Sequence, residues 1–272
     1  MSAAISIENL SVSFPTYGGY VKAVDQVSLQ VQAGEIVGLV GESGSGKTIT
    51  SLTTLGLLPQ NANPQVNGVV KVLGDDVLSM NNKQLEQIRG ARIALIPQEP
   101  MTALNPSIRV GKQINMVIRA HQPKNEDQAR KQTRELLEKM GITDSRRVAE
   151  SFPFELSGGL QQRVLLAMAF SCQPEVLIAD EPTTALDVTI QKQVLDLIRL
   201  RVKESQVATL FITHDMGVVW ELCDRVYVMN QGQVVEHGDT RKILSQPEHP
   251  YTCKLLNALP ERNEKRQPLP LD

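Results

Sequence analysis

The chain has 272 residues, of which 41% are hydrophobic and 21% are charged, so it is long enough to enclose a sizeable core. Its formal net charge of −2 provides no general attraction to the phosphates of nucleic acids. No apolar run reaches the roughly 18 residues of a membrane span, and the first residues lack the pattern of a signal peptide. The three cysteines lie far apart, which favours reduced thiols over disulfides or a metal site.

The first part of the chain predicts strands, then a buried strand, then a helix. Alternating apolar residues predict strands near residues 5–14 and 27–31. The apolar run at 35–40 predicts a buried strand, and residues 49–58 predict a helix that Pro59 ends.

A phosphate-loop pattern, G-x-x-x-x-G-K-[ST], lies between that strand and that helix. Its residues are Gly41, Glu42, Ser43, Gly44, Ser45, Gly46, Lys47 and Thr48. The glycines allow backbone N–H groups to surround phosphates, Lys47 supplies positive charge for the β- and γ-phosphates, and the Thr48 hydroxyl is a magnesium ligand. The pattern therefore predicts that the chain binds the polyphosphate of a nucleotide together with Mg²⁺.

The middle of the chain has a different character. After a predicted strand at 92–97, residues 105–155 are polar, rich in helix-forming residues and without a strand signal. A helix over 126–140, ended by Gly141, is the clearest element there. We expect a helical subdomain inserted at about residues 100–160. From Val176 onward, apolar strands and helices alternate again, which is typical of a parallel sheet covered on both faces.

Two adjacent acids, Asp180 and Glu181, follow the apolar strand at 176–179. Ligands of open parallel sheets lie at the carboxyl ends of strands, so Asp180 is predicted to support the magnesium ion and Glu181 to orient the attacking water. Alone, the pattern fits equally well a strand that runs into a polar turn. The phosphate loop upstream favours the functional interpretation.

The segment 156–163 reads Leu-Ser-Gly-Gly-Leu-Gln-Gln-Arg and predicts a helix capped by Ser157. Beside that helix start, Gly158 and Gly159 expose N–H groups where the helix dipole favours an anion. An ordinary capped helix is the alternative interpretation. If the segment binds phosphate, the residues leave open whether it serves the same nucleotide or one held by another subunit.

Several motifs occur in the order found in ABC-type ATPases, which the chain resembles over nearly its whole length. These motifs are the phosphate loop, Gln98, residues 156–163, the Asp180–Glu181 pair, Asp187 and His214. The resemblance implies an α/β fold with a P-loop NTPase (RecA-like) core, a β-subdomain and an inserted α-helical subdomain. It also implies an ABC ATPase domain over residues 1–240 and a short C-terminal extension of the oligopeptide/nickel transporter type over 241–272.

In that family two ATPase subunits face each other head to tail, and each ATP lies between them. The resemblance implies that Ser157, Gly158 and Gly159 touch the γ-phosphate of ATP on the opposite subunit. It implies that Gln98 senses the magnesium ion and the attacking water, and that His214 contacts the γ-phosphate. Asp187 is expected at the interface between the two subunits.

The family places an adenine-stacking aromatic in the early loop; Phe14 fits by position, while Tyr17, Tyr20 and a purely structural Phe14 are the alternatives. Leu160 stands where the family pattern has Gln, which affects one contact near the partner's ribose. Because Gln161 and Gln162 follow, the geometry of the capped helix is expected to survive.

The segment 99–106 and the motif His249-Pro-Tyr-Thr resemble the peptide/nickel branch of bacterial importers. We expect the latter to be the start of a helix with Pro250 in its first turn, and not a metal site. The short tail after this motif and Leu160 in place of Gln both resemble some nickel or metal-chelate members. The resemblance therefore favours nickel or metal-chelate cargo slightly over peptides.

The implied partners are a second ATPase subunit, identical or paralogous, and two transmembrane permease subunits, with an extracytoplasmic substrate-binding protein as an indirect partner. The implied location is peripheral, on the cytoplasmic face of the inner membrane. A soluble ABC-type ATPase that acts on DNA or ribosomes is the alternative from another class, but the chain has one cassette, no long heptads and no basic surplus. Glu181 and His214 argue against a regulator that binds ATP without hydrolysing it.

Overall fold

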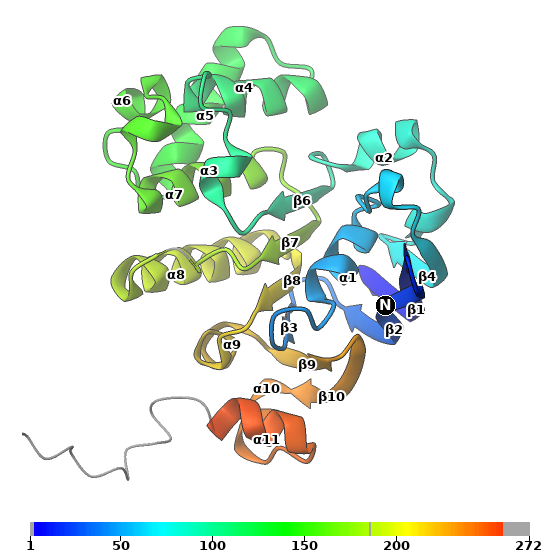
Figure 1. Ribbon diagram of the computed structural model, residues 1–272. Helices are drawn as coiled ribbons and strands as arrows, with labels where there is room; N and C mark the ends of the chain where they lie inside the picture. The colour runs from blue at the N-terminus through cyan, green and yellow to red at the C-terminus, as the bar shows by residue number, and fades with distance from the viewer. Residues whose placement is uncertain (1–2, 185, 258–272) are drawn as a thin grey trace, which may run out of the picture.

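The computed structural model describes residues 3–184 and 186–257, which form two sheets with helices around them (Figure 1). The smaller sheet is antiparallel and has the strand order β2-β1-β4-β5. Its strands are β1 (Ile5–Thr16), β2 (Gly19–Val31), β4 (Gln65–Val72) and β5 (Asp75–Asp76). The hairpin of β1 and β2 pairs Thr16 with Gly19, so both strands extend further into residues 15–20 than the sequence predicts.

The larger sheet has the order β10-β9-β3-β8-β7-β6. Every neighbouring pair is parallel except β10 with β9, which form a hairpin around Asn230–Gly232. The strands are β3 (Ile36–Val40), β6 (Ile93–Ile96), β7 (Val176–Asp180), β8 (Ala208–Thr213), β9 (Arg225–Asn230) and β10 (Gln233–Asp239). All residues of β3, β7 and β8 are buried, as expected for central parallel strands covered on both faces.

Helices cover this sheet and form a separate block between β6 and β7 (Figure 1). The block contains α3 (Pro100–Ala103), α4 (Val110–His121), α5 (Glu126–Lys139), α6 (Ser145–Glu150) and α7 (Gly158–Ala169). The other helices are α1 (Lys47–Thr54), α2 (Asn82–Ile88), α8 (Val188–Ser205), α9 (Met216–Leu222), α10 (Thr240–Ser245) and α11 (Pro250–Asn257). Short 3₁₀ turns lie at η1 (Gln60–Ala62), η2 (Val77–Ser79) and η3 (Pro153–Glu155).

The buried side chains form two clusters, one on each face of the larger sheet. Ile36 and Val40 of β3 belong to the cluster that α7, α8 and α9 cover. Val37 and Leu39 belong to the cluster shared with the smaller sheet. The alternation follows from the two-residue period of a strand, and it fixes β3 between two packed layers.

Helix α1 differs from its predicted extent, because it ends at Thr54 instead of residue 58. Gly56 has φ of +62°, and the N–H of Leu57 donates to the carbonyl of Leu52 at 2.7 Å. A left-handed glycine with such a bond ends a helix before any proline is reached. The same signal at Gly141, with φ of +73°, ends α5 as predicted.

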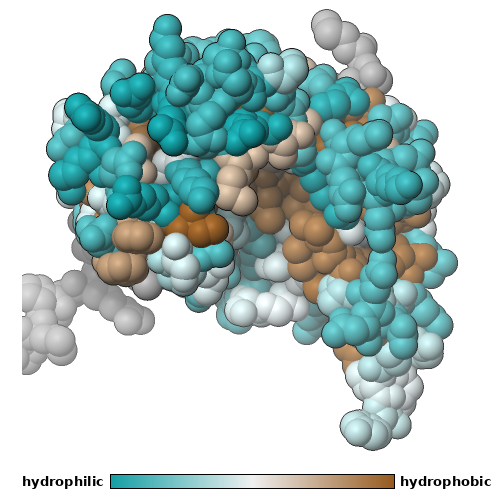
Figure 2. All heavy atoms as spheres, turned by 90° about the horizontal axis from the view of Figure 1, so that it is seen from above, coloured by the Kyte–Doolittle hydropathy of each residue, from teal (hydrophilic) through white to brown (hydrophobic). Residues whose placement is uncertain are grey.

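Seen from above, the surface is hollowed between two largely hydrophilic sides, and hydrophobic residues line part of the hollow (Figure 2). On the helical block, Met116 and Phe154 are exposed, at 54% and 67% of their surface. Among the described residues, no helix combines the length and hydropathy that crossing a bilayer requires.

Candidate active site

The candidate residues lie at the carboxyl ends of four neighbouring strands, β3, β8, β7 and β6. The phosphate loop follows β3, His214 follows β8, Glu181 follows β7 and Gln98 lies two residues after β6. Because these strands are parallel, their carboxyl ends meet at one edge of the sheet. The fold thus brings together groups that are far apart in the chain.

The phosphate loop is held by close contacts with neighbouring backbone. Gly46 has φ of +102°, and a Cβ atom there would lie 2.6 Å from the carbonyl oxygen of Ala23 on β2. The N–H of Gly232, in the turn between β9 and β10, donates to the carbonyl of Ser45 at 3.0 Å. Gly46 therefore has both a conformational and a steric reason to be glycine.

Lys47 begins α1 and is 5% exposed. Its ammonium donates to the carbonyl oxygens of Gly41 at 2.8 Å and Glu42 at 3.0 Å. Burial lowers the pKa of Lys47, whereas the carboxylates of Glu181 and Asp180 oppose that change. The lysine thus lies inside the loop with both acids in electrostatic reach.

Asp180, the last residue of β7, is 8% exposed. Burial raises the pKa of its carboxyl, and Glu181 raises it further, while the hydroxyl of Thr48 and the ammonium of Lys47 oppose the rise. Its Oδ1 atom is buried and has no hydrogen-bond partner. A buried carboxylate oxygen without a partner, beside the Thr48 hydroxyl, is a suitable ligand for a hard cation.

Three side chains of the site contact one carboxylate oxygen of Glu181. Its Oε2 atom lies 3.2 Å from Nε2 of Gln98, 3.1 Å from Nδ1 of His214 and 3.0 Å from Oγ1 of Thr184. The backbone of Glu181 has φ of +45°, an unusual conformation for glutamate, and its N–H donates to the carbonyl of Ile212 at 2.9 Å. Such strain persists where the surrounding structure fixes it, and it is common at functional sites.

Thr184 is absent from the residues that the sequence predicts for the site. It lies three residues after Glu181, where a threonine hydroxyl can reach back to the carboxylate and the carbonyl of the turn, and it does both. The available signal was this spacing within Glu181-Pro-Thr-Thr184.

The segment predicted as a second phosphate site starts α7 as expected. Ser157 is the N-cap residue, and its hydroxyl accepts the N–H of Leu160 at 3.4 Å. Leu160 is partly buried against the core, and a Cβ atom on Gly159 would lie 2.7 Å from Cγ2 of Ile190. Helix α7 packs against α5, α8 and α4, whereas α1 packs against β4, β2 and β7. Within one chain the fold therefore does not place this helix start at the phosphate loop (Figure 1).

Phe14 is partly buried against the core, whereas Tyr17 and Tyr20 are exposed near the tip of the β1–β2 hairpin. Asp187 caps α8 by accepting the N–H of Ile190 at 2.9 Å.

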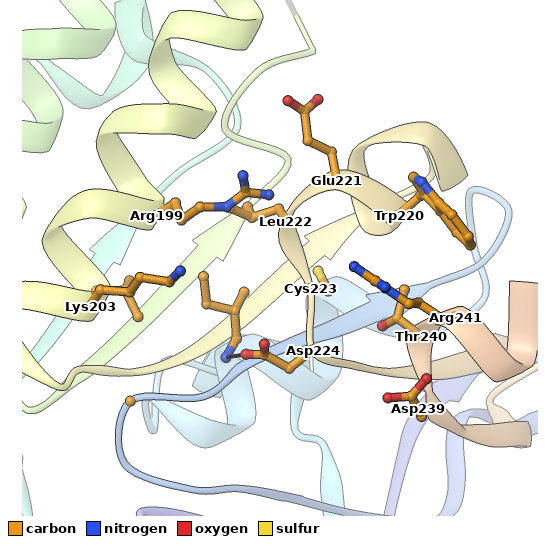
Figure 3. A pocket seen from close by; sticks show the side chains of 13 residues that line it. Arg199, Lys203, Trp220, Glu221, Leu222, Cys223, Asp224, Asp239, Thr240 and Arg241 are labelled. Carbon is orange, nitrogen blue, oxygen red and sulfur yellow. Dashed lines mark hydrogen bonds between the residues drawn. The ribbon is translucent and has the colours of Figure 1, made fainter.

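A cavity of about 470 Å³ lies at the opposite end of the large sheet (Figure 3). Arg199 and Lys203 line it from α8, and Trp220 lines it from α9. The carboxylate of Asp224 accepts the N–H of Ile36, at the start of β3, across 2.9 Å. The cavity therefore lies by the amino ends of these strands and is separate from the site described above.

Comparison with known proteins agrees with this geometry. The family model described as ABC transporter matches residues 24–184, and one described as oligopeptide/dipeptide transporter, C-terminal region, matches residues 235–271. The chain belongs to the ABC transporter family. As a member of the family it is an ATPase with the P-loop fold that the sequence predicts.

Two relatives and one solved structure illustrate the membership of this ABC ATPase. It is 53% identical to the probable D,D-dipeptide transport ATP-binding protein DdpD of Escherichia coli (strain K12), over 98% of this chain and 81% of the relative. It is 44% identical to the dipeptide transport ATP-binding protein DppD of Bacillus subtilis (strain 168), over 96% and 78%. The dimeric structure of MJ0796, a bacterial ABC transporter cassette, is 25% identical, with a TM-score of 0.76 over 87% of this chain and 99% of that one.

Proposed function

We propose that the site formed by Lys47, Glu181, His214 and Gln98 hydrolyses ATP to power uptake through a membrane transporter. The convergence of Gln98, His214 and Thr184 on one oxygen of Glu181, beside the phosphate loop, carries this proposal. In it, Lys47 exchanges its two carbonyl partners for the β- and γ-phosphates. Glu181 orients and polarises the attacking water, while His214 contacts the γ-phosphate.

The donor set also fits a magnesium ion. Asp180 supplies a buried carboxylate oxygen without a partner, Thr48 a hydroxyl, and Gln98 a side-chain amide. Oxygen donors of this kind are the ligands that Mg²⁺ prefers. When bound, the ion would supply positive charge at the β- and γ-phosphates. By this proposal Asp180 remains charged so that it can hold the ion. Burial of that charge destabilises the protein when no ion is bound.

We propose that Ser157, Gly158 and Gly159 complete the site of a second ATPase subunit, identical or paralogous. Since α7 and α1 lie in different parts of one chain, the N–H groups at the start of α7 can reach only an ATP that a partner subunit holds. The dimeric MJ0796 cassette supports such an arrangement. Asp187, which caps the next helix, is then expected near the interface between the subunits.

The helical segment at about residues 100–160 and Gln98 are the proposed link to two permease subunits. The exposed side chains of Met116 and Phe154 on this segment offer apolar contacts for such a partner. The protein would then be peripheral, on the cytoplasmic face of the membrane. We propose an ABC ATPase domain over residues 1–240, with the C-terminal extension following it.

Peptides are the proposed cargo. The names of the two relatives refer to dipeptides, and the family model for the C-terminal region refers to oligopeptides and dipeptides. These relatives do not support the slight preference for nickel or metal chelates that the sequence motifs suggest. We propose Phe14 as the adenine-stacking ring, with Tyr17 and Tyr20 as the alternatives.

The test is to co-purify the chain with its membrane subunits, reconstitute the complex with its substrate-binding protein, and measure ATP hydrolysis with dipeptides and with nickel. We expect dipeptides to stimulate hydrolysis in the wild-type complex and not in a complex containing Lys47→Ala. Salt-sensitive DNA binding without membrane partners would favour the alternative function.

A further inference from the structure

The C-terminal helix contacts the phosphate loop directly. The hydroxyl of Tyr251, in the first turn of α11, accepts the backbone N–H of Glu42 at 2.9 Å, although the two residues are 209 positions apart. The Tyr251 side chain is 9% exposed and belongs to the main core cluster. A hydrogen bond made by a buried ring from a packed helix has a fixed geometry, unlike one made by a free surface side chain.

Helix α11 is itself anchored at its start. The carboxylate of Glu236 on β10 accepts the N–H groups of Glu248 at 2.8 Å and His249 at 3.2 Å. Nδ1 of His249 accepts the N–H of Tyr251 at 3.2 Å, so this histidine caps the helix. Leu256, at 2% exposed, packs the helix against the core. Position and orientation of Tyr251 are thus set by the large sheet.

One peptide group of the loop is bonded at both of its ends. The carbonyl of Gly41 accepts the Lys47 ammonium at 2.8 Å, and the N–H of Glu42 in the same peptide group donates to Tyr251. The ammonium has three donors, so contact with both the β- and γ-phosphates gives up at least one of its two carbonyl bonds. The Tyr251 bond takes no part in that exchange, so it can keep this peptide group oriented through it.

We propose that Tyr251 is a positioning residue for ATP binding, and that α11 couples the C-terminal region to the phosphate loop. This rests on the proposed role of the loop in binding the ATP polyphosphate. A loop that is held in its binding conformation loses less freedom when ATP binds, so the contact favours affinity more than turnover. By thermodynamic reciprocity, ATP in the loop must in turn stabilise the docking of α11.

The hydroxyl and the nearby ion pair make different contributions. Lys254 lies 3.4 Å from the Glu42 carboxylate, but these side chains are 72% and 55% exposed. Exposed pairs of this kind contribute little because water and salt screen them. The effect of α11 on the loop is therefore assigned to Tyr251, and Lys254→Met should leave the Kd for ATP unchanged.

The test compares Tyr251→Phe with Tyr227→Phe in the full chain. Tyr227 is 5% exposed, and its hydroxyl accepts the N–H of Gln30 at 3.3 Å, which makes it a matched buried tyrosine outside the site. We expect Tyr251→Phe to raise the Kd of a fluorescent ATP analogue by about 3- to 10-fold, the effect of one net hydrogen bond. Its kcat at saturating ATP should change little, and Tyr227→Phe should bind as the parent does.

Hydrogen exchange supplies the second measurement. The amide of Glu42 should exchange faster in Tyr251→Phe, and ATP should slow exchange in α11 of the parent but not of this variant. A folded Tyr251→Phe with the parent's Kd and the parent's α11 protection would overturn the proposal. Lys47→Ala separates this proposal from the proposed role of the phosphate loop. If Lys47→Ala binds ATP as the parent does, the proposed role of the loop fails. If it does not bind ATP, an unaffected Tyr251→Phe refutes the α11 contact alone.

Discussion

Nδ1 of His214 lies 3.1 Å from Oε2 of Glu181, which joins the ends of two adjacent strands, β8 and β7, across the candidate site. The same oxygen also accepts hydrogen bonds from Gln98 and Thr184. These two hydrogen bonds and the His214 contact fix the orientation of the carboxylate.

Glu181→Gln should bind ATP and dimerise with ATP, yet hydrolyse it about 10²- to 10⁴-fold more slowly, because the amide cannot polarise the attacking water. Steady-state phosphate release and size-exclusion chromatography with ATP measure the two properties. Hydrolysis at the parent's rate would remove Glu181 from the proposed role.

Thr184→Val should lower kcat by about 3- to 10-fold, because the carboxylate loses one of its orienting hydrogen bonds. The KM for ATP should stay near that of the parent, since Thr184 is not proposed to touch ATP. Thr184→Ser keeps the hydroxyl and is the control that should restore most of the rate. Equal rates for the valine and serine variants would show that the hydroxyl is irrelevant.

Asp180→Asn should abolish hydrolysis but stabilise the protein without nucleotide by about 1 kcal/mol, or about 2–4 °C in Tm. Burial raises the pKa of Asp180, so the folded state binds this proton more tightly than the unfolded chain does. The charged carboxylate therefore destabilises the fold at pH above that raised pKa, and the penalty disappears as the pH falls through it.

Thermal melts of both proteins over a pH series, without Mg²⁺ or nucleotide, measure this difference. The gap in Tm between Asp180→Asn and the parent should be largest at neutral pH and close on acidification. A variant less stable than the parent at pH 7 contradicts the inference that burial of the charged Asp180 carboxylate destabilises the fold.

Ser157→Arg should leave ATP binding by the single subunit intact but prevent ATP-dependent dimerisation, because the long side chain would occupy the space reserved for the partner's γ-phosphate. Binding titrations and sedimentation separate these two properties. Both are measured in a chain that also carries Glu181→Gln, so that bound ATP is not hydrolysed. Dimers that form normally with Ser157→Arg in both subunits would exclude the proposed composite site.

Local patterns were enough to predict much of this protein. The phosphate loop follows a buried strand and begins α1, and Ser157 caps α7, because each depends on residues within a few positions in the chain. The hairpin at Asn230–Gly232 was predictable for the same reason. The end of α1 was predicted wrongly because Pro59 was taken as the signal when Gly56 supplies it.

Contacts between distant segments could not be predicted in this way. The bond between Tyr251 and Glu42 depends on where α11 docks, which the motif around His249 does not reveal. The order of strands in the large sheet brings Gln98 and Glu181 to hydrogen-bond distance although 83 positions separate them. Neither periodicity nor local spacing shows which distant segments lie side by side. Only the resemblance to a known family supplied that expectation.

The division of the site among four strands also has a consequence for refolding. The phosphate loop lies between β3 and α1, which are adjacent in the chain, whereas Gln98, Glu181 and His214 meet only after β6, β7 and β8 have paired. Pairings between such distant segments are slow to form. A refolding chain should therefore regain turnover only after β6, β7 and β8 have paired, and the slow phase of ATP hydrolysis would report when that part of the sheet forms.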